Sequence, residues 1–323
     1  MRSTELLRRV GRARFPLGAP SWPTSVPRPG PGRRIGLDYD HEWSRSYPVR
    51  LARAVVVDNV TRPLAHLVAP TTLLGEEHLR HVESPVIFAA NHASHVDTPL
   101  LLTALPVRFR HRTAVAAAAD YFFDTTWKSV LWSFSLAAIP IERSRVNRRS
   151  ADMAADLLED GWNLVIFPEG GRSPDGWAQP FRGGAAYLAR RTGRPVVPVY
   201  LHGTRHVLPK RADKGSRAPG GSGTEQRARR GPRRSPVTVA FGRPLVPDEG
   251  EDARRFSARV ERAVAVLGDE VRTDWWTARR LAASGESPSP HGPEASPWRR
   301  AWALGPRPDE TRGDEPAWPR QGR

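Results

Sequence analysis

Two short stretches of the sequence carry side chains suited to chemistry, and each follows an apolar run typical of a buried strand. Residues 91–97 follow the run 85–90, and residues 167–173 follow the run 164–167. Functional residues of open α/β proteins usually lie beyond the carboxyl ends of the strands. We therefore expect the two stretches to meet at one edge of a sheet and to form one site.

The first stretch contains His92 and Asp97, a pair that can act as a catalytic base. A carboxylate bonded to one imidazole nitrogen fixes the tautomer and leaves the other nitrogen free to take a proton. An imidazole near its unperturbed pKa of ~6.5 suits this role at neutral pH. Such a base would activate a hydroxyl of the substrate itself, so a nucleophilic serine or cysteine is not needed. Two alternatives stay open: the pair only caps a helix start, or it ligates a metal with His95, although no further ligand stands out.

The second stretch is suited to binding phosphate. Gly170 and Gly171 let backbone N–H groups approach an anion, and Arg172 can hold phosphate oxygens with two hydrogen bonds. Glu169 would repel phosphate, so we expect it to orient Arg172 or to accept a hydrogen bond from a substrate hydroxyl. Arg143, at the end of another strand-like run, would add a second positive charge. The alternative is a glycine-rich turn with a solvated arginine.

Composition narrows the classes of function. The chain has 323 residues, a formal net charge of +16 and no cysteine. The lack of cysteine excludes disulfides, thiolate metal sites and cysteine nucleophiles, and it is compatible with a reducing cytoplasm. The charge predicts attraction to nucleic acid, an acidic membrane surface or a phosphorylated substrate. A coding bias toward arginine would give the same charge, so charge alone does not choose among them.

One globular domain is expected at residues 41–282. Residues 1–40 and 283–323 hold too few core-forming side chains and are predicted to be disordered arms. Within the domain, residues 205–235 are rich in Lys, Arg and Gly, which predicts a mobile basic loop. The N-terminus lacks a secretory pattern, and the longest apolar stretch, 130–141, is shorter than the ~20 residues that cross a bilayer. The sequence favours a cytoplasmic protein that is soluble or peripheral to a membrane.

Strands that alternate with helices predict an α/β domain whose single sheet is covered on both faces. The expected strands are residues 71–74, 86–90, 112–119, 137–143, 164–167, 195–201 and 237–241. The expected helices are residues 48–69, 98–105, 127–136, 151–160, 183–191 and 252–282.

Three of these elements carry a more specific expectation. Helix 48–69 has apolar residues at helical spacing, which favours packing on the core over lying on a membrane, and Pro63 should kink or split it. Pro198 within its strand indicates an edge strand, a bulge or a position facing a ligand. Helix 127–136 is expected to pack on the sheet through one apolar face, formed by Val130, Leu131 and Phe134.

Four blocks of the sequence, taken in order, resemble the glycerolipid acyltransferase family, which includes the 1-acylglycerol-3-phosphate acyltransferases. The blocks are Asn91-His92-x4-Asp97, Ile139 to Arg143, Phe167 to Ser173 and Val197 to Val199, and Phe181 to Ala189 resembles the segment after the third block. The resemblance runs from about residue 47 to 245. It implies a single α/β domain with a mixed, largely parallel central sheet flanked by helices.

The resemblance also implies a role for each matched residue. His92 would take the proton from an acceptor hydroxyl, Asp97 would orient His92, and the oxygen would attack the thioester of acyl-CoA or acyl-carrier protein. The acceptor's phosphate and glycerol would be bound by Arg143, Glu169, Gly170, Gly171 and Arg172, and the site would be shaped by Pro198. The family needs no cofactor or metal beyond the acyl co-substrate.

Two blocks depart from the family pattern. Gly171 stands where the family commonly has Thr, and Ala138 and Pro140 stand where Gly and Phe are more usual. Both blocks belong to acceptor binding, so the acceptor is less certain than the reaction.

The sequence predicts an O-acyltransferase that acts in phospholipid synthesis at the inner face of the cell membrane. It would acylate 1-acylglycerol 3-phosphate to phosphatidic acid, and the anionic lipid surface would attract its positive charge. An alternative acceptor is glycerol 3-phosphate, another lysophospholipid or a lysoglycolipid. A different class, a basic non-catalytic nucleic-acid-binding protein that uses residues 205–235, lacks a recognition-helix pattern, so no nucleic-acid partner is expected.

Overall fold

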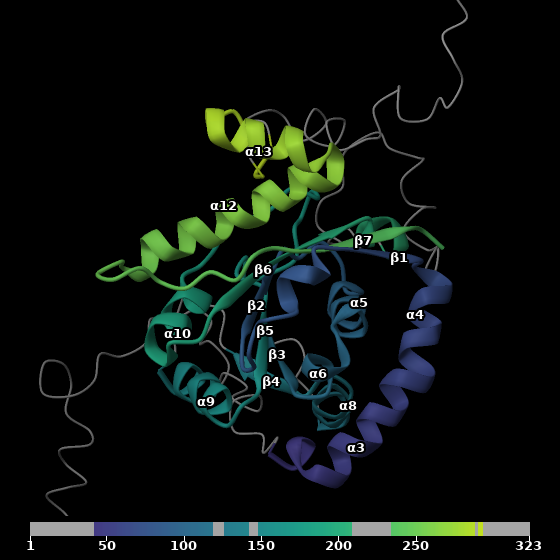
Figure 1. Cartoon of the computed structure of the whole chain (residues 1–323). Helices are drawn as coiled ribbons and strands as arrows, with labels where there is room; N and C mark the ends of the chain where they lie inside the picture. The colour runs from purple at the N-terminus through teal and green to yellow at the C-terminus, as the bar shows by residue number, and fades with distance from the viewer. Residues whose placement is uncertain (1–41, 119–125, 142–147, 209–233, 288–289, 293–323) are drawn as a thin grey trace, which may run out of the picture. The chain divides into compact units, whose positions relative to one another are not determined.

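The computed structural model describes residues 42–118, 126–141, 148–208, 234–287 and 290–292. Its centre is a seven-stranded sheet with the order β1-β7-β6-β2-β5-β3-β4 (Figure 1). The strands are β1 (Thr71–Leu74), β2 (Ile87–Ala90), β3 (Thr113–Ala118), β4 (Ala138–Ile141), β5 (Asn163–Ile166), β6 (Val196–His202) and β7 (Val237–Phe241). All neighbouring pairs are parallel except β6 and β7, which are antiparallel. This confirms the predicted mixed, largely parallel sheet.

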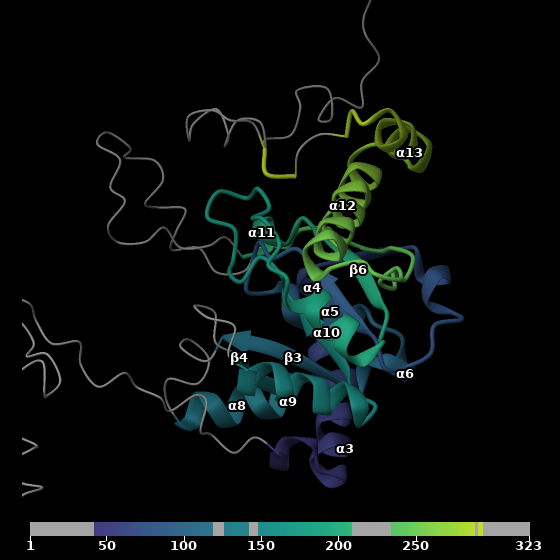
Figure 2. The ribbon, with the colours of Figure 1, turned by 90° about the vertical axis from the view of Figure 1, so that its left-hand side faces the viewer.

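Helices cover both faces of the sheet because its inner strands are apolar on both sides. In β2, Phe88 belongs to the core on one face, whereas Ile87 and Ala89 belong to the core on the other. The first face is covered by α4 (Arg62–Val68), α5 (Asp97–Ala104), α6 (Val107–Arg110) and α8 (Thr126–Leu136). The second is covered by α9 (Arg148–Glu159), α10 (Gly184–Thr192) and α12 (Ala253–Arg272), and Figure 2 shows α9 and α10 side by side.

The helix expected at residues 252–282 is two helices, α12 and α13 (Trp275–Ser284). The chain leaves helical geometry at Thr273, and Asp274 caps the new helix by accepting a hydrogen bond from the backbone N–H of Thr277 at 3.0 Å. Apolar periodicity alone does not reveal this break, because the new helix begins at a polar residue that caps a backbone N–H group and leaves the apolar spacing unchanged.

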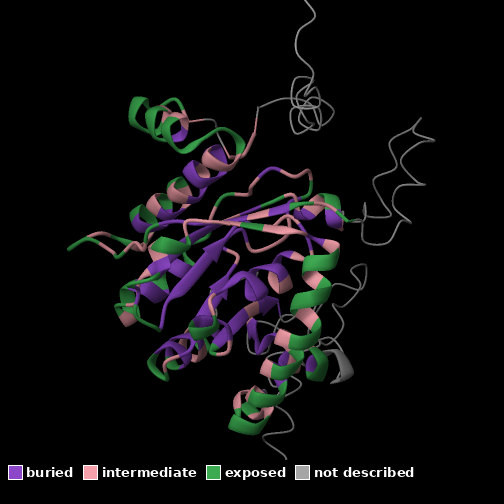
Figure 3. Ribbon diagram, turned by 45° about the vertical axis from the view of Figure 1, so that its right-hand side comes forward, coloured by how far each residue is buried: buried purple, intermediate pink, exposed green. Residues whose placement is uncertain are grey.

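The helix expected at residues 48–69 was predicted to pack on the core, and this holds for only part of it: Ala65 and Val68 pack against the core. The segment forms α3 (Tyr47–Val56), one π-helical turn η2 (Val57–Thr61) and α4. Pro63 lies in the first turn of α4, directly after the π turn, where its missing N–H costs little. The large apolar side chains of the segment are exposed, as Figure 3 shows for much of its length: Tyr47, Leu51, Val55, Val56, Val60, Leu64 and Leu67.

Helix α8 also differs from its predicted packing. Val130 and Leu131 are exposed, whereas Ser129, Ser133 and Leu136 face the interior. Helix α8 contacts α3, so the exposed apolar residues of these two helices lie on neighbouring elements. The small side chains of the two serines allow the helix to pack closely on the interior. The spacing of large apolar residues in the sequence does not predict this kind of packing. Among the described helices, none is both long enough and apolar enough to cross a membrane.

Pro198 was expected at an edge strand, a bulge or a position facing a ligand, and it lies in β6, an interior strand paired with β2 and β7. Its position explains why it is tolerated. The regular antiparallel register with β7 ends at Val199 and Phe241, Gly242 donates its N–H to the carbonyl of Pro198 at 2.8 Å, and antiparallel pairing resumes at Val196 and Leu245. The donor that proline lacks therefore falls in an irregular step of the ladder.

The predicted arms and loop are only partly described. Residues 1–40, and 209–233 of the predicted basic loop, lie outside the described residues. The first residues of that loop form a short helix, α11 (Thr204–Val207), instead of irregular chain. At the other end, α13 continues to Ser284, and residues 290–292 pack on the domain through backbone hydrogen bonds.

Candidate active site

The turn after β2 is fixed to the neighbouring strand by side-chain hydrogen bonds. The Asn91 side chain donates to the carbonyl of Leu201 at 3.0 Å and accepts from its N–H at 2.7 Å, so it replaces a peptide unit of the ladder. The Ser94 hydroxyl donates to the carbonyl of Leu208 at 2.6 Å. Both side chains are buried. These hydrogen bonds therefore hold the turn in a fixed position relative to the sheet, although the turn itself is not part of a strand.

His92 and Asp97 meet across this turn, as the sequence predicted. Nδ1 of His92 lies 2.8 Å from Oδ2 of Asp97, and the same oxygen accepts the N–H groups of Ala93 and Ser94, each at 2.7 Å. Asp97 is fully buried at 0% exposure. A carboxylate oxygen accepts, so Nδ1 carries the proton and Nε2 has a free lone pair. This is the arrangement of an oriented general base.

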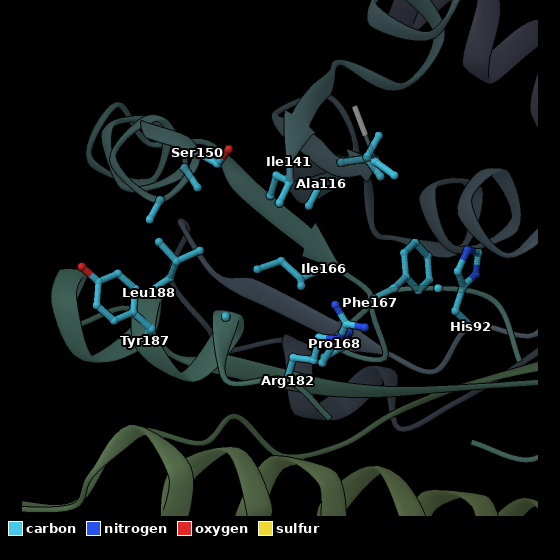
Figure 4. Close-up of a pocket in the computed structure, with 18 of the residues that line it drawn as sticks. His92, Ala116, Ile141, Ser150, Ile166, Phe167, Pro168, Arg182, Tyr187 and Leu188 are labelled. Atoms are coloured by element: carbon cyan, nitrogen blue, oxygen red, sulfur yellow. The ribbon is translucent and has the colours of Figure 1, made fainter. Parts of the chain in front are cut away.

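The His92 ring lies at one end of an apolar cavity. It stacks on Phe167 with ring centroids 4.2 Å apart and planes at 23°, and both residues line the cavity (Figure 4). The cavity has a volume of about 380 Å³ and passes between β3, β5 and the helices α9 and α10. Its wall is formed mainly by aliphatic side chains such as Ile141, Ile166 and Leu188. A catalytic base therefore faces a space suited to an extended hydrocarbon group.

The carboxylate of Glu169 is used differently from the prediction. One oxygen accepts the backbone N–H of His92 at 2.9 Å, and the other accepts the N–H of Gln179 at 3.0 Å. Glu169 is 4% exposed, and it is not among the described residues that line the cavity. Burial raises the pKa of Glu169 to about 7, although both N–H groups act in the opposite direction. Glu169 thus holds the backbone of the base in place, and its predicted contact with the acceptor stays a prediction.

Arg182 is a site residue that the sequence interpretation did not propose. Its side chain lines the cavity and lies over Gly170, where a built Cβ would be 2.8 Å from Nε of Arg182. Gly170 has φ +70°, a conformation that favours glycine, and any side chain there would also push Arg182 aside. The signal was present in the sequence, because Arg182 lies in the stretch 181–189 that resembles the family.

The remaining predicted binding residues are placed unevenly. Gly170 and Gly171 line the cavity, whereas Arg172 and Pro198 are absent from the described lining. Arg172 is half-buried on the other side of the turn, near His95. Burial, and next the positive charge of Arg172, lower the pKa of His95 to about 4.

Two further expectations concern Arg143 and a metal site. Arg143 lies outside the described residues, so its predicted role stays a prediction. For a metal site, the described part of the chain contains no group of three or more His, Asp or Glu side chains placed to hold an ion.

Part of the chain is similar to known proteins. Residues 71–202 match the family model described as Acyltransferase, a range that contains the stretches 91–97 and 167–173. A 1-acyl-sn-glycerol-3-phosphate acyltransferase of Chlamydomonas reinhardtii is 30% identical over 193 residues, which is 58% of this chain and 50% of that protein. A chloroplastic 1-acyl-sn-glycerol-3-phosphate acyltransferase of Brassica napus is 30% identical over 144 residues, 43% of this chain and 39% of that protein. The chain thus spans about half, or less, of the length of these curated relatives.

The fold has a counterpart among solved structures. The crystal structure of the 1-acyl-sn-glycerophosphate (LPA) acyltransferase PlsC from Thermotoga maritima aligns with a TM-score of 0.50 at 24% identity. The alignment covers 74% of this chain and 87% of that one. The alignment supports the predicted fold, and the sequence matches confirm the predicted resemblance to glycerolipid acyltransferases.

Proposed function

Because residues 71–202 are an acyltransferase-family region, we propose that the chain transfers an acyl group to the hydroxyl of 1-acylglycerol 3-phosphate and so forms phosphatidic acid. The donor is a thioester, acyl-CoA or acyl-carrier protein, and no further cofactor is required. The observation that carries the proposal is the His92–Asp97 pair, whose free ring nitrogen lies at the end of an apolar cavity. The named relatives support the choice of acceptor.

The reaction needs one base and no acyl-enzyme. Nε2 of His92 takes the proton of the acceptor hydroxyl, and the oxygen forms a bond to the carbonyl carbon of the thioester. The carbon–sulfur bond then breaks, and the thiolate receives the proton from the imidazolium. The buried carboxylate of Asp97 stabilises the imidazolium while it exists and keeps the ring oriented.

The cavity is suited to the acyl chain. Its walls are largely aliphatic, and its volume of about 380 Å³ lies within the ~300–1,000 Å³ that small-molecule sites usually have. An acyl chain in this space would place its carbonyl carbon beside His92, at the polar end. We assign phosphate binding to Arg182, which lies in the cavity wall beside the two glycines, and to Arg172 on the neighbouring turn.

The exposed apolar residues of α3–η2–α4 support contact with a lipid surface. Leu51, Val55, Leu64 and Leu67 are each at least 55% exposed and recur at helical spacing on one segment. Exposed apolar patches of this kind mark protein or membrane contact sites, and arginines within the segment would favour anionic lipid. We infer that the protein binds peripherally to the membrane that holds its lysolipid substrate, on the cytoplasmic face.

A panel of acceptors tests the proposal. Purified protein would be incubated with acyl-CoA and an equimolar mixture of 1-acylglycerol 3-phosphate, glycerol 3-phosphate and lysophosphatidylcholine, and the products would be identified by mass spectrometry. The proposal predicts phosphatidic acid as the main product. If the main product came from either of the other acceptors, the chain would still be an acyltransferase, but the choice of 1-acylglycerol 3-phosphate as acceptor would be rejected. If no acylated product formed, the proposed function would be rejected.

A further inference from the structure

A short segment near the C-terminus, residues 290–292, lies against the loop that connects the phosphate-suited stretch with α10. The backbone N–H of Ala178 donates to the carbonyl of Pro290 at 3.0 Å. In return, Nδ1 of His291 lies 2.9 Å from the carbonyl oxygen of Ala178. The backbone N–H and the backbone carbonyl of Ala178 thus both have a hydrogen-bond partner in the C-terminal segment.

The second ring nitrogen of His291 reaches another element. Nε2 lies 2.8 Å from Oε1 of Glu261 on α12, and the other oxygen of Glu261 accepts the N–H of Phe181 at 3.4 Å. Both nitrogens of His291 therefore face acceptors, a carbonyl and a carboxylate. Through these two contacts His291 connects the C-terminal segment, the loop and α12.

A second contact holds the same loop from the other side. Trp177 is buried, and the guanidinium of Arg272 on α12 lies 5.6 Å from the centre of its ring. Gly292 packs directly against the indole, in a place where any Cβ would clash with it. The glycine also has φ +75°, a conformation that other residues rarely adopt. The fit of Gly292 to Trp177 shows that the segment is packed on the loop over several residues.

The loop leads directly to the base. Gln179, the residue after Ala178, donates its N–H to Glu169, and the other oxygen of Glu169 accepts the N–H of His92. Three residues further, Arg182 donates its N–H to the carbonyl of Pro168 at 2.8 Å and places its side chain in the cavity wall. An unbroken series of contacts therefore runs from His291 to the backbone of His92 and to the side chain of Arg182.

We propose that His291 is a positioning residue, which holds loop 176–182 so that Glu169 and Arg182 stand in place beside the base. The expected effect on catalysis rests on the proposed function. The contacts of His291 with the loop and with α12 do not depend on it. His291 touches no substrate, and its effect passes through Ala178 and Glu261. A chain that ended before residue 290 would lack both contacts.

The test compares His291→Ala with the full-length wild type by hydrogen exchange and kinetics. The variant should exchange faster in peptides that cover residues 174–182, with unchanged exchange in strand β2. It should lower kcat about tenfold, because losing the hydrogen bonds to Ala178 and Glu261 loosens the loop that positions Glu169 and Arg182. The KM for the acyl donor should stay within about twofold, since the aliphatic cavity wall is intact.

Two further variants separate positioning from a general loss of stability. His291→Asn places an amide donor where Nδ1 stood, so it keeps the bond to Ala178 and should recover part of kcat. His81→Ala, at an exposed histidine, should behave as wild type in both measurements. Unchanged exchange at 174–182 in His291→Ala, or faster exchange with wild-type kcat, would overturn the proposal. If the wild-type chain transferred no acyl group, the proposed function would fail, while the exchange comparison would still decide whether His291 holds the loop.

Discussion

The two strand-end stretches each bury a carboxylate, and the two carboxylates work differently. Asp97 accepts all three of its hydrogen bonds at one oxygen, from groups within five residues of it. Glu169 uses both oxygens, and its donors are His92, 77 residues away, and Gln179, ten residues away. Asp97 orients the ring of the base, and Glu169 joins the backbone of the base to a distant loop. The comparison separates local orientation from long-range positioning within one site.

Apart from loss of the base itself, the largest effect should come from the charge of Asp97. In Asp97→Asn the amide oxygen can replace Oδ2 and keep the hydrogen bonds, so the variant removes mainly the negative charge that stabilises the imidazolium. We expect kcat to fall by roughly 10²–10³ with little change in the KM of either substrate. Steady-state kinetics measures this, and a loss below tenfold would show that orientation alone matters.

The next effect is on stability and belongs to Glu169. Its pKa is about 7 in the folded chain against 4.5 for the unperturbed group. The unfolded chain loses this proton first as pH rises, so the stability contributed by the group is full below pH 4.5 and lost by about pH 7. The free energy of unfolding should change by about 3 kcal/mol over this range relative to Glu169→Gln. Urea unfolding at several pH values measures it; parallel curves for the two proteins would contradict the assignment.

Glu169→Gln should also lower activity, but less than Asp97→Asn. The amide has one accepting oxygen, so one of the N–H groups of His92 and Gln179 loses its partner in a buried place. We expect a fall in kcat of about tenfold, the equivalent of ~1.4 kcal/mol. A fall as large as that of Asp97→Asn would erase the distinction between orienting the ring and holding the backbone.

The smallest effect concerns the exposed apolar segment. Leu51→Glu and Leu64→Glu, each at a residue 55% exposed, should weaken sedimentation with phosphatidylcholine–phosphatidylglycerol vesicles by about threefold to tenfold. Val246→Glu is the matched control, because Val246 is also 55% exposed but lies outside α3–η2–α4. An equal loss in all three variants, or none in the leucine variants, would reject lipid contact through this segment.

Features that depend on residues close together in the sequence could be predicted, whereas features that depend on contacts between distant parts of the chain could not. The sheet and the His92–Asp97 pair could be predicted, because apolar runs and a five-residue spacing are local signals. The hydrogen bonds of Glu169 could not be predicted, because its partners come from parts of the chain that only the fold brings together. The place of Pro198 in an interior strand could not be predicted for a related reason, since its tolerance depends on where the regular pairing with β7 is interrupted.

Helix 48–69 shows a different limit of sequence analysis. Its apolar spacing is the same whether the apolar side faces a core or a lipid surface, so the periodicity predicted a helix but not its environment. The structure decides this, because the interior is already filled by α5 and α6 while Leu64 and Leu67 remain exposed.

The central claim is that His92 is the base for acyl transfer to 1-acylglycerol 3-phosphate. The most direct test is the rate of phosphatidic acid formation from acyl-CoA by His92→Ala, with His206→Ala, at an exposed histidine of α11, as the matched control. The account predicts a fall in kcat/KM of about 10³–10⁴ for His92→Ala and wild-type activity for the control. Activity of His92→Ala within tenfold of wild type would contradict the assignment of the base.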